Sequence, residues 1–476
     1  MSTENLIFSG VALYMVAMLG IGYYASRKAQ SVADFMVAGR GLSLPVLSMT
    51  VMATWFGGAM MLGGAGAAFD DGMLGVIADP WGGALALILV AMFFARVFRR
   101  LKVITVADFM EQRFGRTASV AITAATIFSN VMWVAGMLVA FGTIFEVLTS
   151  IPVETGIVVG AVIVFAYTML GGMWAVALTD FVQMTIIMIG LVVLLVVVLI
   201  DVGGWGAIGP KLPAGTFNML PPENTSEQWL NYLRAWTIIG LVDISAQTLF
   251  QRASAAKTER IAQQAFYIGG FGYLLFGMIP VFLGIIGSVT MPGIANPEFI
   301  IPELAKVHLH PVLIAIFVGA MLAAIMSSAD SALLGASSVL AKNVLPWIKP
   351  DASSRLTLMA ARLGILLFGG FAIVVALRIQ VIFDLMVDAN ILGLAAIIVP
   401  FIFGVYWKKA NRTGAIAGMG AGLVTWLVTM QLWPHLPSDF MGLGASLVVM
   451  LVVATFTQQF DPPRPLADSD GNPVVP

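Results

Sequence analysis

The sequence predicts an all-α polytopic membrane protein with about thirteen transmembrane helices. Of its 476 residues, 59% are hydrophobic and only 10% are charged, whereas soluble domains usually carry about 25% charged residues. The mean hydropathy is +0.96. Continuously apolar stretches of ~20 residues, the length of a spanning helix, recur along the chain. The strands of a membrane barrel would instead be ~10 residues long and alternating.

The composition excludes several other classes of protein. A soluble globule of this size would expose too much apolar surface, and a net charge of −1 without a long basic run argues against nucleic-acid binding. The chain has no Cys, which excludes disulfides and thiolate metal sites. Its three His residues fall in short loops and are interpreted as structural. No nucleophile–base pair or phosphate loop appears, so an enzyme is not expected.

Thirteen apolar stretches follow one another along the sequence. The first, residues 6–25, has no basic residue before it and is long for a secretory signal, so we interpret it as a retained helix. The others fall near residues 45–69, 74–98, 118–148, 152–171, 174–200, 229–250, 259–288, 309–342, 356–377, 381–407, 411–432 and 440–458.

The distribution of Lys and Arg predicts the orientation in the membrane. An odd number of spans puts the two termini on opposite sides. If the N-terminus lies on the outer side of the membrane, only four of the 24 Lys and Arg residues lie on that side. They are Lys211, Arg234, Lys306 and Arg378. Because inside loops carry the excess of basic residues, we expect a multi-pass protein of the plasma (inner) membrane with a cytoplasmic C-terminus.

The second span contains an irregular segment, which reads ATWFGG from residue 53 to residue 58. Non-helical backbone at membrane depth is tolerated only where it lines a cavity. A packing face of small residues would explain the glycines, but not Thr54 and Trp55. The seventh span is interrupted by polar residues from Asp243 to Gln247. Two interrupted spans in corresponding positions indicate an inverted repeat with a substrate site between them.

This pattern predicts a five-plus-five inverted repeat with one helix before it and two after it. The predicted segments are an N-terminal helix with a cytoplasmic loop (1–44), the first repeat (45–200), an extracellular loop (201–228), the second repeat (229–407), two additional C-terminal helices (408–458) and a disordered cytoplasmic tail (459–476).

Several acidic residues lie within predicted spans, namely Asp79, Asp180, Asp243, Asp330, Asp384 and Asp388. No Lys or Arg is predicted deep in a span to pair with them, so these carboxylates should be protonated or hold cations. Asp79, Asp384 and Asp388 could instead lie in water near span ends. Asp180 and Asp330 lie deeper and are the predicted coupling residues, for sodium or for protons.

The ninth span carries Ser327, Ser328 and Ser331. Ser327 and Ser331 are four residues apart and share a helix face. Hydroxyls and free carbonyls are hard oxygen ligands that suit a small cation. A Ser-rich helix alone is more often bonded to its own backbone, but opposite a broken helix it predicts a sodium site.

Three segments resemble the sodium:solute symporter family. Residues 171–183 (GGMWAVALTDFVQ) are similar to its signature, residues 324–331 (AIMSSADS) to its ion-site helix, and residues 250–252 (FQR) with Lys257 to a cytoplasmic loop. The resemblance covers residues 5–458 and implies the leucine-transporter fold. The five-plus-five repeat of that fold agrees with the spans counted independently.

The resemblance also implies where sodium binds. One site would use the backbone carbonyls of Ala53, Phe56 and Ala324 and the hydroxyls of Ser327 and Ser328. A further sodium would lie near Asp180, Ser327 and Ser331. The sodium ion is therefore the expected cofactor, with one or two ions moved per turnover.

By motif the chain is nearest to the choline-transporter branch, in which aromatic rings cage a quaternary ammonium. Trp55 and Trp133 match two ring positions, whereas Gly83 and Ala246, aligned with two others, have no ring. The proline branch has Asp where this chain has Trp55. We therefore expect a small polar organic solute of the amino acid, carboxylate or amine class. Its predicted binding residues are Thr54, Trp55, Gly57, Asn130, Trp133 and Gln247.

The predicted function is sodium-coupled import of this solute by alternating access. Membrane lipid is the expected surrounding, with no nucleic acid and no obligate protein partner. Three alternatives stay open. They are a proton-coupled symporter that uses Asp180 or Asp330, an uncoupled facilitator of the same solute class and a membrane solute sensor.

Overall fold

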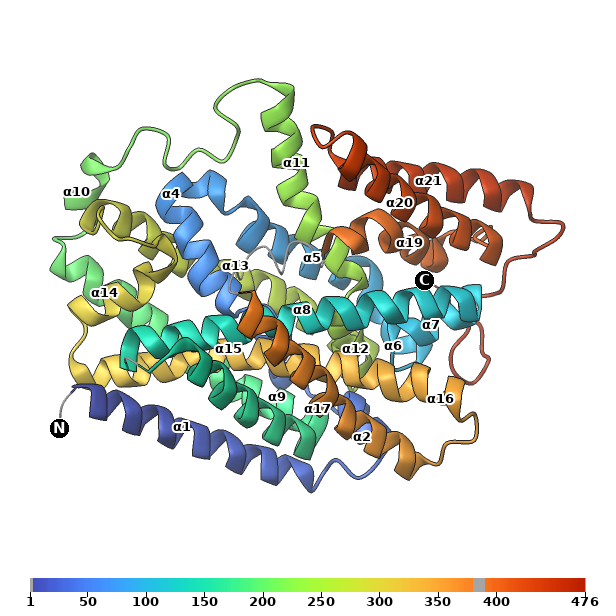
Figure 1. Cartoon of the computed structure of the whole chain (residues 1–476), viewed down its shortest axis with the longest axis horizontal. Coiled ribbons are helices and arrows are strands. Elements are labelled where there is room, and N and C mark those ends of the chain that lie inside the picture. Colours follow the sequence, from blue (N-terminus) through green and yellow to red (C-terminus); the bar gives the residue numbers. More distant parts are fainter. Residues whose placement is uncertain (1–2, 150, 380–389, 476) are drawn as a thin grey trace.

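The computed structural model describes residues 3–149, 151–379 and 390–475 (Figure 1). Within these ranges the regular structure is helical and no β-strand forms. The predicted all-α fold class is therefore confirmed. Two of the predicted intramembrane acids, Asp384 and Asp388, lie outside the described residues.

The chain forms α-helices joined by short 3-10 and π-helical segments (η). In chain order the α-helices are α1 Thr3–Ser26, α2 Val32–Val37, α3 Leu44–Ala53, α4 Ala65–Gly75, α5 Gly83–Leu89, α6 Ala95–Leu101, α7 Val106–Phe114, α8 Arg116–Thr149, α9 Val153–Asp201, α10 Trp205–Ile208, α11 Ser226–Gly240, α12 Gln247–Ala255, α13 Glu259–Thr290, α14 Ile300–His308, α15 Pro311–Val339, α16 Leu345–Ile348, α17 Ser354–Arg378, α19 Ile398–Tyr406, α20 Arg412–Leu432 and α21 Ser438–Phe456. The η segments are η1 Ala38–Arg40, η2 Ala59–Gly64, η3 Ile77–Gly82, η4 Val90–Phe94, η5 Gly209–Lys211, η6 Val242–Ser245, η7 Pro297–Phe299, η8 Leu340–Val344 and η9 Gly393–Ile397.

Eight helical segments of the described chain are long and apolar enough to cross a membrane, and three shorter apolar helices accompany them. One of the eight, α9, covers two of the predicted spans. Its 49 residues would extend about 74 Å at 1.5 Å per residue, more than twice the ~30 Å hydrocarbon core. The total of thirteen spans stays a prediction.

Helix α9 is divided by a kink at Gly172, where φ is +53°. L-residues with a side chain rarely adopt this conformation, whereas glycine does so at little cost. A Cβ at this position would also lie 2.3 Å from the carbonyl oxygen of Phe35 in α2. The kink therefore falls between the predicted spans 152–171 and 174–200.

Helix α15 forms the centre of the bundle. Its side chains from Phe317 to Val339 are all buried, and it packs against α1, α8, α9 and α17 (Figure 1). The peripheral helices α20 and α21 pair with each other and expose apolar side chains, including Val424 and Val448. An exposed apolar surface of this kind fits a lipid environment.

Both predicted interruptions are present in the structure. Helix α3 ends at Ala53, and the chain from Thr54 to Gly57 is not helical. Helix α11 ends at Gly240, and η6 leads to Ala246, whose backbone is extended, before α12 begins. These two breaks expose backbone groups inside the protein, and they position the candidate site.

The C-terminal tail, for which sequence analysis predicts disorder, contacts the end of α6 in the structure. Residues after α21 follow a defined path in which the Ser469 amide donates to the Leu101 carbonyl at 2.9 Å. The Lys102 ammonium lies 3.0 Å from Asp468 and, with Asn472, holds the pKa of Asp468 well below its usual range. Sequence composition cannot show this contact, because the basic end of α6 that attracts the tail lies far away in the sequence.

Candidate sodium and solute site

The end of α3 brings a free backbone carbonyl against the serines of α15. The Ala53 carbonyl accepts hydrogen bonds from the hydroxyls of Ser327 at 3.2 Å and Ser328 at 3.3 Å. Ser327 also donates to the Ala324 carbonyl at 2.8 Å. All four residues are buried. Uncharged hard oxygens from a broken helix and a facing helix therefore converge, which is a donor set that fits a sodium ion.

Phe56 is the aromatic residue next to this site. Its backbone carbonyl is also a predicted sodium ligand. Phe56 lies in the same non-helical segment and is completely buried. Its ring packs edge-on against Tyr273 of α13, with 5.8 Å between the centroids. This packing holds the broken segment between α13 and α15.

Gly57 fits against α15 because it has no side chain. A Cβ there would lie 2.4 Å from the Ser328 hydroxyl oxygen and 3.0 Å from the Ser328 Cβ. Sequence analysis predicts Gly57 as a solute-binding residue, but the structure places it against Ser328 instead of in the cavity described below. Its absent side chain allows the break to approach the serines.

Replacing Gly57 with Ala should raise the sodium concentration needed for half-maximal thermal stabilisation by about tenfold. Overpacking costs about 1–3 kcal/mol, and each 1.4 kcal/mol corresponds to a tenfold change in affinity. A sodium titration of the unfolding temperature measures the effect. Gly63→Ala is the matched control, because a Cβ at Gly63 meets no atom within 4 Å. Identical titrations for the two variants would contradict the prediction.

A second buried group of polar side chains surrounds Asp180 of α9. Thr50 of α3 donates a short hydrogen bond to Asp180 Oδ2, and Arg252 Nη2 of α12 lies 3.6 Å from the same oxygen. Arg252 also donates to the Thr50 carbonyl at 3.1 Å and to the Ser331 hydroxyl. The other oxygen of Asp180, Oδ1, has no hydrogen-bond partner among the described residues.

This arrangement corrects the prediction that no basic residue pairs with the intramembrane acids. Arg252 has no exposed surface and lies between Asp180 and Ser331. Sequence analysis assigns it to a cytoplasmic loop, because an Arg after an interrupted span looks like the end of that span. Helix α12 continues inside the protein, however, and its last turn reaches α3, α9 and α15.

Asp330, the second predicted coupling residue, is also completely buried. Its Oδ2 accepts a hydrogen bond of 2.6 Å from the hydroxyl of Tyr167 in α9, and its Oδ1 accepts one of 3.1 Å from Ser331. Ser331 in turn donates to the Ser327 carbonyl at 2.7 Å. One chain of contacts therefore joins both predicted coupling acids to the serines beside the broken helix.

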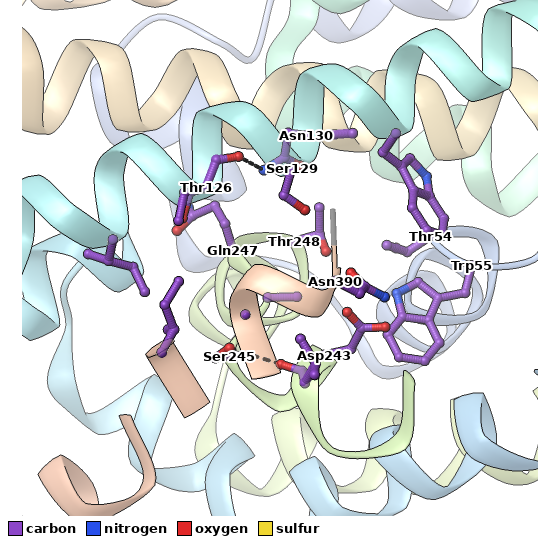
Figure 2. Close-up of a pocket in the computed structure, with 18 of the residues that line it drawn as sticks. Thr54, Trp55, Thr126, Ser129, Asn130, Asp243, Ser245, Gln247, Thr248 and Asn390 are labelled. Atoms are coloured by element: carbon purple, nitrogen blue, oxygen red, sulfur yellow. Dashed lines mark hydrogen bonds between the residues drawn. The ribbon is translucent and has the colours of Figure 1, made fainter. Parts of the chain in front are cut away.

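A cavity opens beside the break, between α8, α12 and α15 (Figure 2). We call it the central cavity. The structure brings together here five of the six predicted solute-binding residues, namely Thr54, Trp55, Asn130, Trp133 and Gln247. Ser328 lines it as well, so one of the predicted sodium ligands also borders the central cavity.

Several polar groups of the central cavity are already engaged. The Thr54 hydroxyl and the Asn130 amide each donate to the carbonyl four residues earlier, at 2.6 and 2.7 Å. The Gln247 amide accepts from the Val106 amide at 2.8 Å and donates to the Ile104 carbonyl at 3.3 Å. Gln247 therefore links the start of α12, just after the break, to the start of α7. Little of its amide remains available to bind a solute.

Asp243 and Asn390 also line the central cavity, although sequence analysis assigns neither a role in solute binding (Figure 2). Asp243 stands out in the sequence as an intramembrane acid and as the first residue of the interruption in the seventh span. Asn390 belongs to the last predicted span of the second repeat, in which only the acids Asp384 and Asp388 are singled out. The interruption of the seventh span is the signal that could have pointed to Asp243, whereas the sequence around Asn390 carries no such mark.

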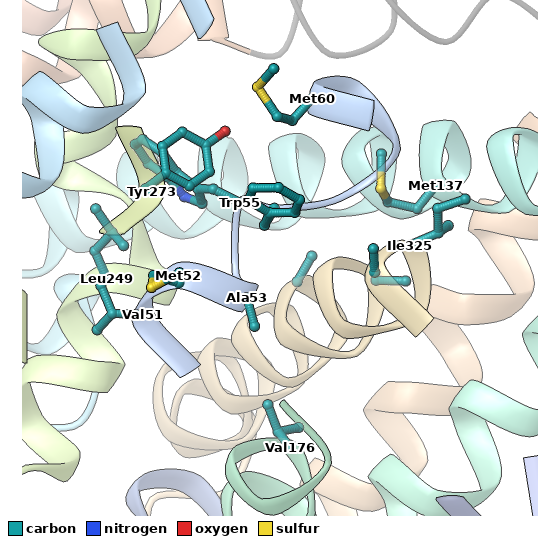
Figure 3. Packing of buried hydrophobic residues seen from close by; sticks show 14 of the residues in the cluster. Val51, Met52, Ala53, Trp55, Met60, Met137, Val176, Leu249, Tyr273 and Ile325 are labelled. Atoms are coloured by element: carbon teal, nitrogen blue, oxygen red, sulfur yellow. The ribbon is translucent and has the colours of Figure 1, made fainter. Parts of the chain in front are cut away.

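A second cavity lies on the other side of Trp55, among η2, α4, η3, α11 and α13. Asp79 and Tyr273 line it, and the Tyr273 hydroxyl donates to Asp79 Oδ1 at 2.6 Å. Tyr273 also packs edge-on against Trp55, with centroids 6.3 Å apart (Figure 3). The two cavities have a set of residues in common, which we call the shared wall: Trp55, Trp133, Asp243 and Asn390.

Comparison with known families identifies the family to which the chain belongs. The model of the sodium:solute symporter family matches residues 35–422, most of the chain. The chain belongs to the sodium:solute symporter family. This symporter is accordingly a membrane transporter and not an enzyme.

Known relatives of the symporter act on different solutes. It is 29% identical to the high-affinity choline transporter 1 of Caenorhabditis elegans, over 90% of this chain and 79% of that protein. It is equally 29% identical to the osmoregulated proline transporter of Bacillus subtilis, over 95% of both chains. A small organic solute is therefore supported as a class, while the particular solute is not decided by similarity.

The fold of the symporter also matches a solved transporter. A Na+-coupled sialic acid symporter in a substrate-bound, outward-open state superimposes with a TM-score of 0.82 over 95% of this chain and 98% of that chain, at 18% identity. This likeness supports the leucine-transporter fold predicted from the sequence.

Proposed function

We propose that this symporter imports a small polar organic solute together with sodium, by alternating access. The observation that carries the proposal is the position of Ser328. Its hydroxyl faces the free Ala53 carbonyl at 3.3 Å and also lines the central cavity. A sodium ion between the broken helix and α15 would therefore order the residues that contact the solute.

Coupling follows from the order of residues along the broken segment. Ala53 is followed directly by Thr54 and Trp55, which line the central cavity. Sodium that holds Ala53 against α15 thus fixes the solute-binding residues next to it. Linkage then requires that the solute tighten sodium binding by the same factor. The two cavities meet at the shared wall. The solute enters from one side of the membrane through one cavity and leaves to the other side through the other cavity, in alternate states of the protein.

A second cation site near Asp180 is part of the proposal. Asp180 Oδ1 lacks a hydrogen-bond partner among the described residues, and the group formed by Asp180, Asp330 and Arg252 contains two acids but one base. A further sodium with Ser327 and Ser331 as additional ligands would balance it. A proton on Asp180 or Asp330 would do the same, which keeps proton coupling as the second candidate.

The proposed orientation places the N-terminus outside and the C-terminus in the cytoplasm. The central cavity includes Ile122 and Thr126, which are near the basic beginning of α8 at Arg116. Since basic residues favour the cytoplasmic side, the central cavity lies toward the cytoplasm and the second cavity toward the outside. We propose the plasma (inner) membrane as its location.

Uptake into proteoliposomes tests the function. The purified protein is first screened by thermal stability against amines, zwitterionic amino acids and carboxylates, each in sodium and in potassium. A ligand of the native state raises its stability by mass action. The solute found is then offered at equal concentrations on both sides under an inward sodium gradient, and we expect it to accumulate.

Each alternative gives a different result in this experiment. A facilitator would equilibrate the solute without accumulation, and a proton symporter would accumulate it under a pH gradient in potassium alone. A sensor would bind the solute without flux. Accumulation that requires sodium and collapses when the sodium gradient is removed supports the proposal, and any of the other three results overturns it.

A further inference from the structure

We propose that the transported solute is a cationic amine with N–H groups, held at the shared wall by Asp243 and Asp79. This inference rests on the proposed function, because it names the solute class of the same site. It depends on the two acids that line the cavities, whose roles the sodium site does not explain.

The carboxylate of Asp243 lines both cavities, and no described residue supplies it with a counter-ion. Asp243 is half-buried, and within the described residues it makes no hydrogen bond or ion pair through its side chain. Figure 2 shows it near Asn390 and Trp55. The lining of each cavity, as far as the structure describes it, contains no Lys, Arg or His. A carboxylate withdrawn from water needs a cation or hydrogen-bond donors to compensate it.

Asp79 brings a second carboxylate to the same wall. A Cβ on Gly83 would lie 2.9 Å from Asp79 Oδ1 and 3.3 Å from Cε3 of Trp55, so the acid and the indole are neighbours. Tyr273 donates one hydrogen bond to Asp79 Oδ1, and among the described residues no donor is bonded to the other carboxylate oxygen. Two acids therefore lie near the Trp55 ring and favour positive charge in the second cavity beside the shared wall.

The chemistry of the wall selects among charged solutes. A carboxylate solute would be repelled by both acids. A quaternary ammonium could contact the Trp55 and Trp133 rings, but it has no hydrogen to donate to Asp243, Asp79 or the Asn390 carbonyl oxygen. A primary or secondary ammonium can contact the aromatic rings and also donate hydrogen bonds to the carboxylates. Such charge-assisted hydrogen bonds are about twice as strong as neutral ones.

A methylation series tests this choice on the unaltered protein. Thermal stability and uptake are measured in sodium with a panel of small primary amines and with ethanolamine, N-methylethanolamine, N,N-dimethylethanolamine and choline. These four compounds keep the same skeleton while their N–H groups fall from three to none. Apparent affinity should decrease along the series by about tenfold or more in total. Equal or tighter binding of choline, or no effect of any amine, overturns the proposal.

Substitution of the acids gives an independent readout. Asp243→Asn and Asp79→Asn should each weaken amine binding by about tenfold or more. Asp71→Asn is the matched control, because Asp71 is an exposed acid of α4 outside both cavities. Unchanged amine affinity in Asp243→Asn would overturn the proposal. If a variant does not fold, the methylation series still decides.

The result also separates this inference from the proposed function. If zwitterions or carboxylates alone stabilise the protein and do so only in sodium, sodium symport stands and the amine assignment is wrong. If amines stabilise the protein equally in sodium and potassium, the amine assignment stands and sodium coupling is wrong.

Discussion

Replacing Arg252 with Met should destabilise the protein by about 3–5 kcal/mol, the usual result of removing one partner of a buried ion pair. Arg252 is completely buried and compensates Asp180 at 3.6 Å while it donates to the Thr50 and Thr248 carbonyls at 3.1 and 3.2 Å. Without it, the buried Asp180 carboxylate keeps its hydrogen bond from Thr50 but loses the positive charge that compensates it. The unfolding temperature and the folded yield of the purified protein measure the loss.

Two further variants identify the cause of that loss. Arg260→Met removes an exposed Arg at the beginning of α13 and should change stability by no more than about 0.5 kcal/mol. The double variant Arg252→Met with Asp180→Asn should recover part of the stability, because the uncompensated charge is gone. An Arg252→Met protein as stable as the parent would show that the ion pair contributes nothing to the fold.

Replacing Ser327 with Ala should raise the sodium concentration for half-maximal uptake by about tenfold or more, since a polar contact to a charged group contributes about 1.5–3 kcal/mol. Ser327 is the sharper choice for this test because it contacts the Ala53 carbonyl without lining the central cavity. Ser328→Ala should act in the same direction, and it should weaken sodium dependence more than it alters the preference among solutes.

Ser337→Ala is the control for these serine variants. Ser337 lies in the same buried helix, but its hydroxyl bonds to the Leu334 carbonyl of its own helix at 3.1 Å. Its sodium activation curve should match that of the parent. If Ser327→Ala also matches the parent, the oxygens at the break do not bind the coupling ion.

Local composition predicts the broken helix and the facing serines well. The segment from Ala53 to Gly58 combines glycines with Thr54 and Trp55 at a depth where lipid would require a regular helix. A non-helical backbone at that depth is tolerated only where it lines a cavity, so both the break and the cavity beside it could be predicted. The serines of α15 could be inferred for the same reason, since their spacing places them on one helix face.

The features that sequence could not predict depend on contacts between distant segments. Arg252 looks like a loop residue until α12 is seen to continue inside the bundle. Asp243 and Asp79 are both visible in the sequence as acids, but only the fold places both of them near Trp55. The tail is likewise polar and rich in proline, and its contact with Lys102 joins it to a segment far away in the sequence.

The shared wall has a consequence for the direction of transport. Trp55, Trp133, Asp243 and Asn390 line both cavities. In the proposed mechanism, the groups that receive the solute from one side are therefore the groups that release it to the other. Such a carrier has no intrinsic forward direction. With sodium equal on both sides and no membrane potential, vesicles preloaded with unlabelled solute should exchange it for labelled solute from outside, and reversing the sodium gradient should drive the solute out.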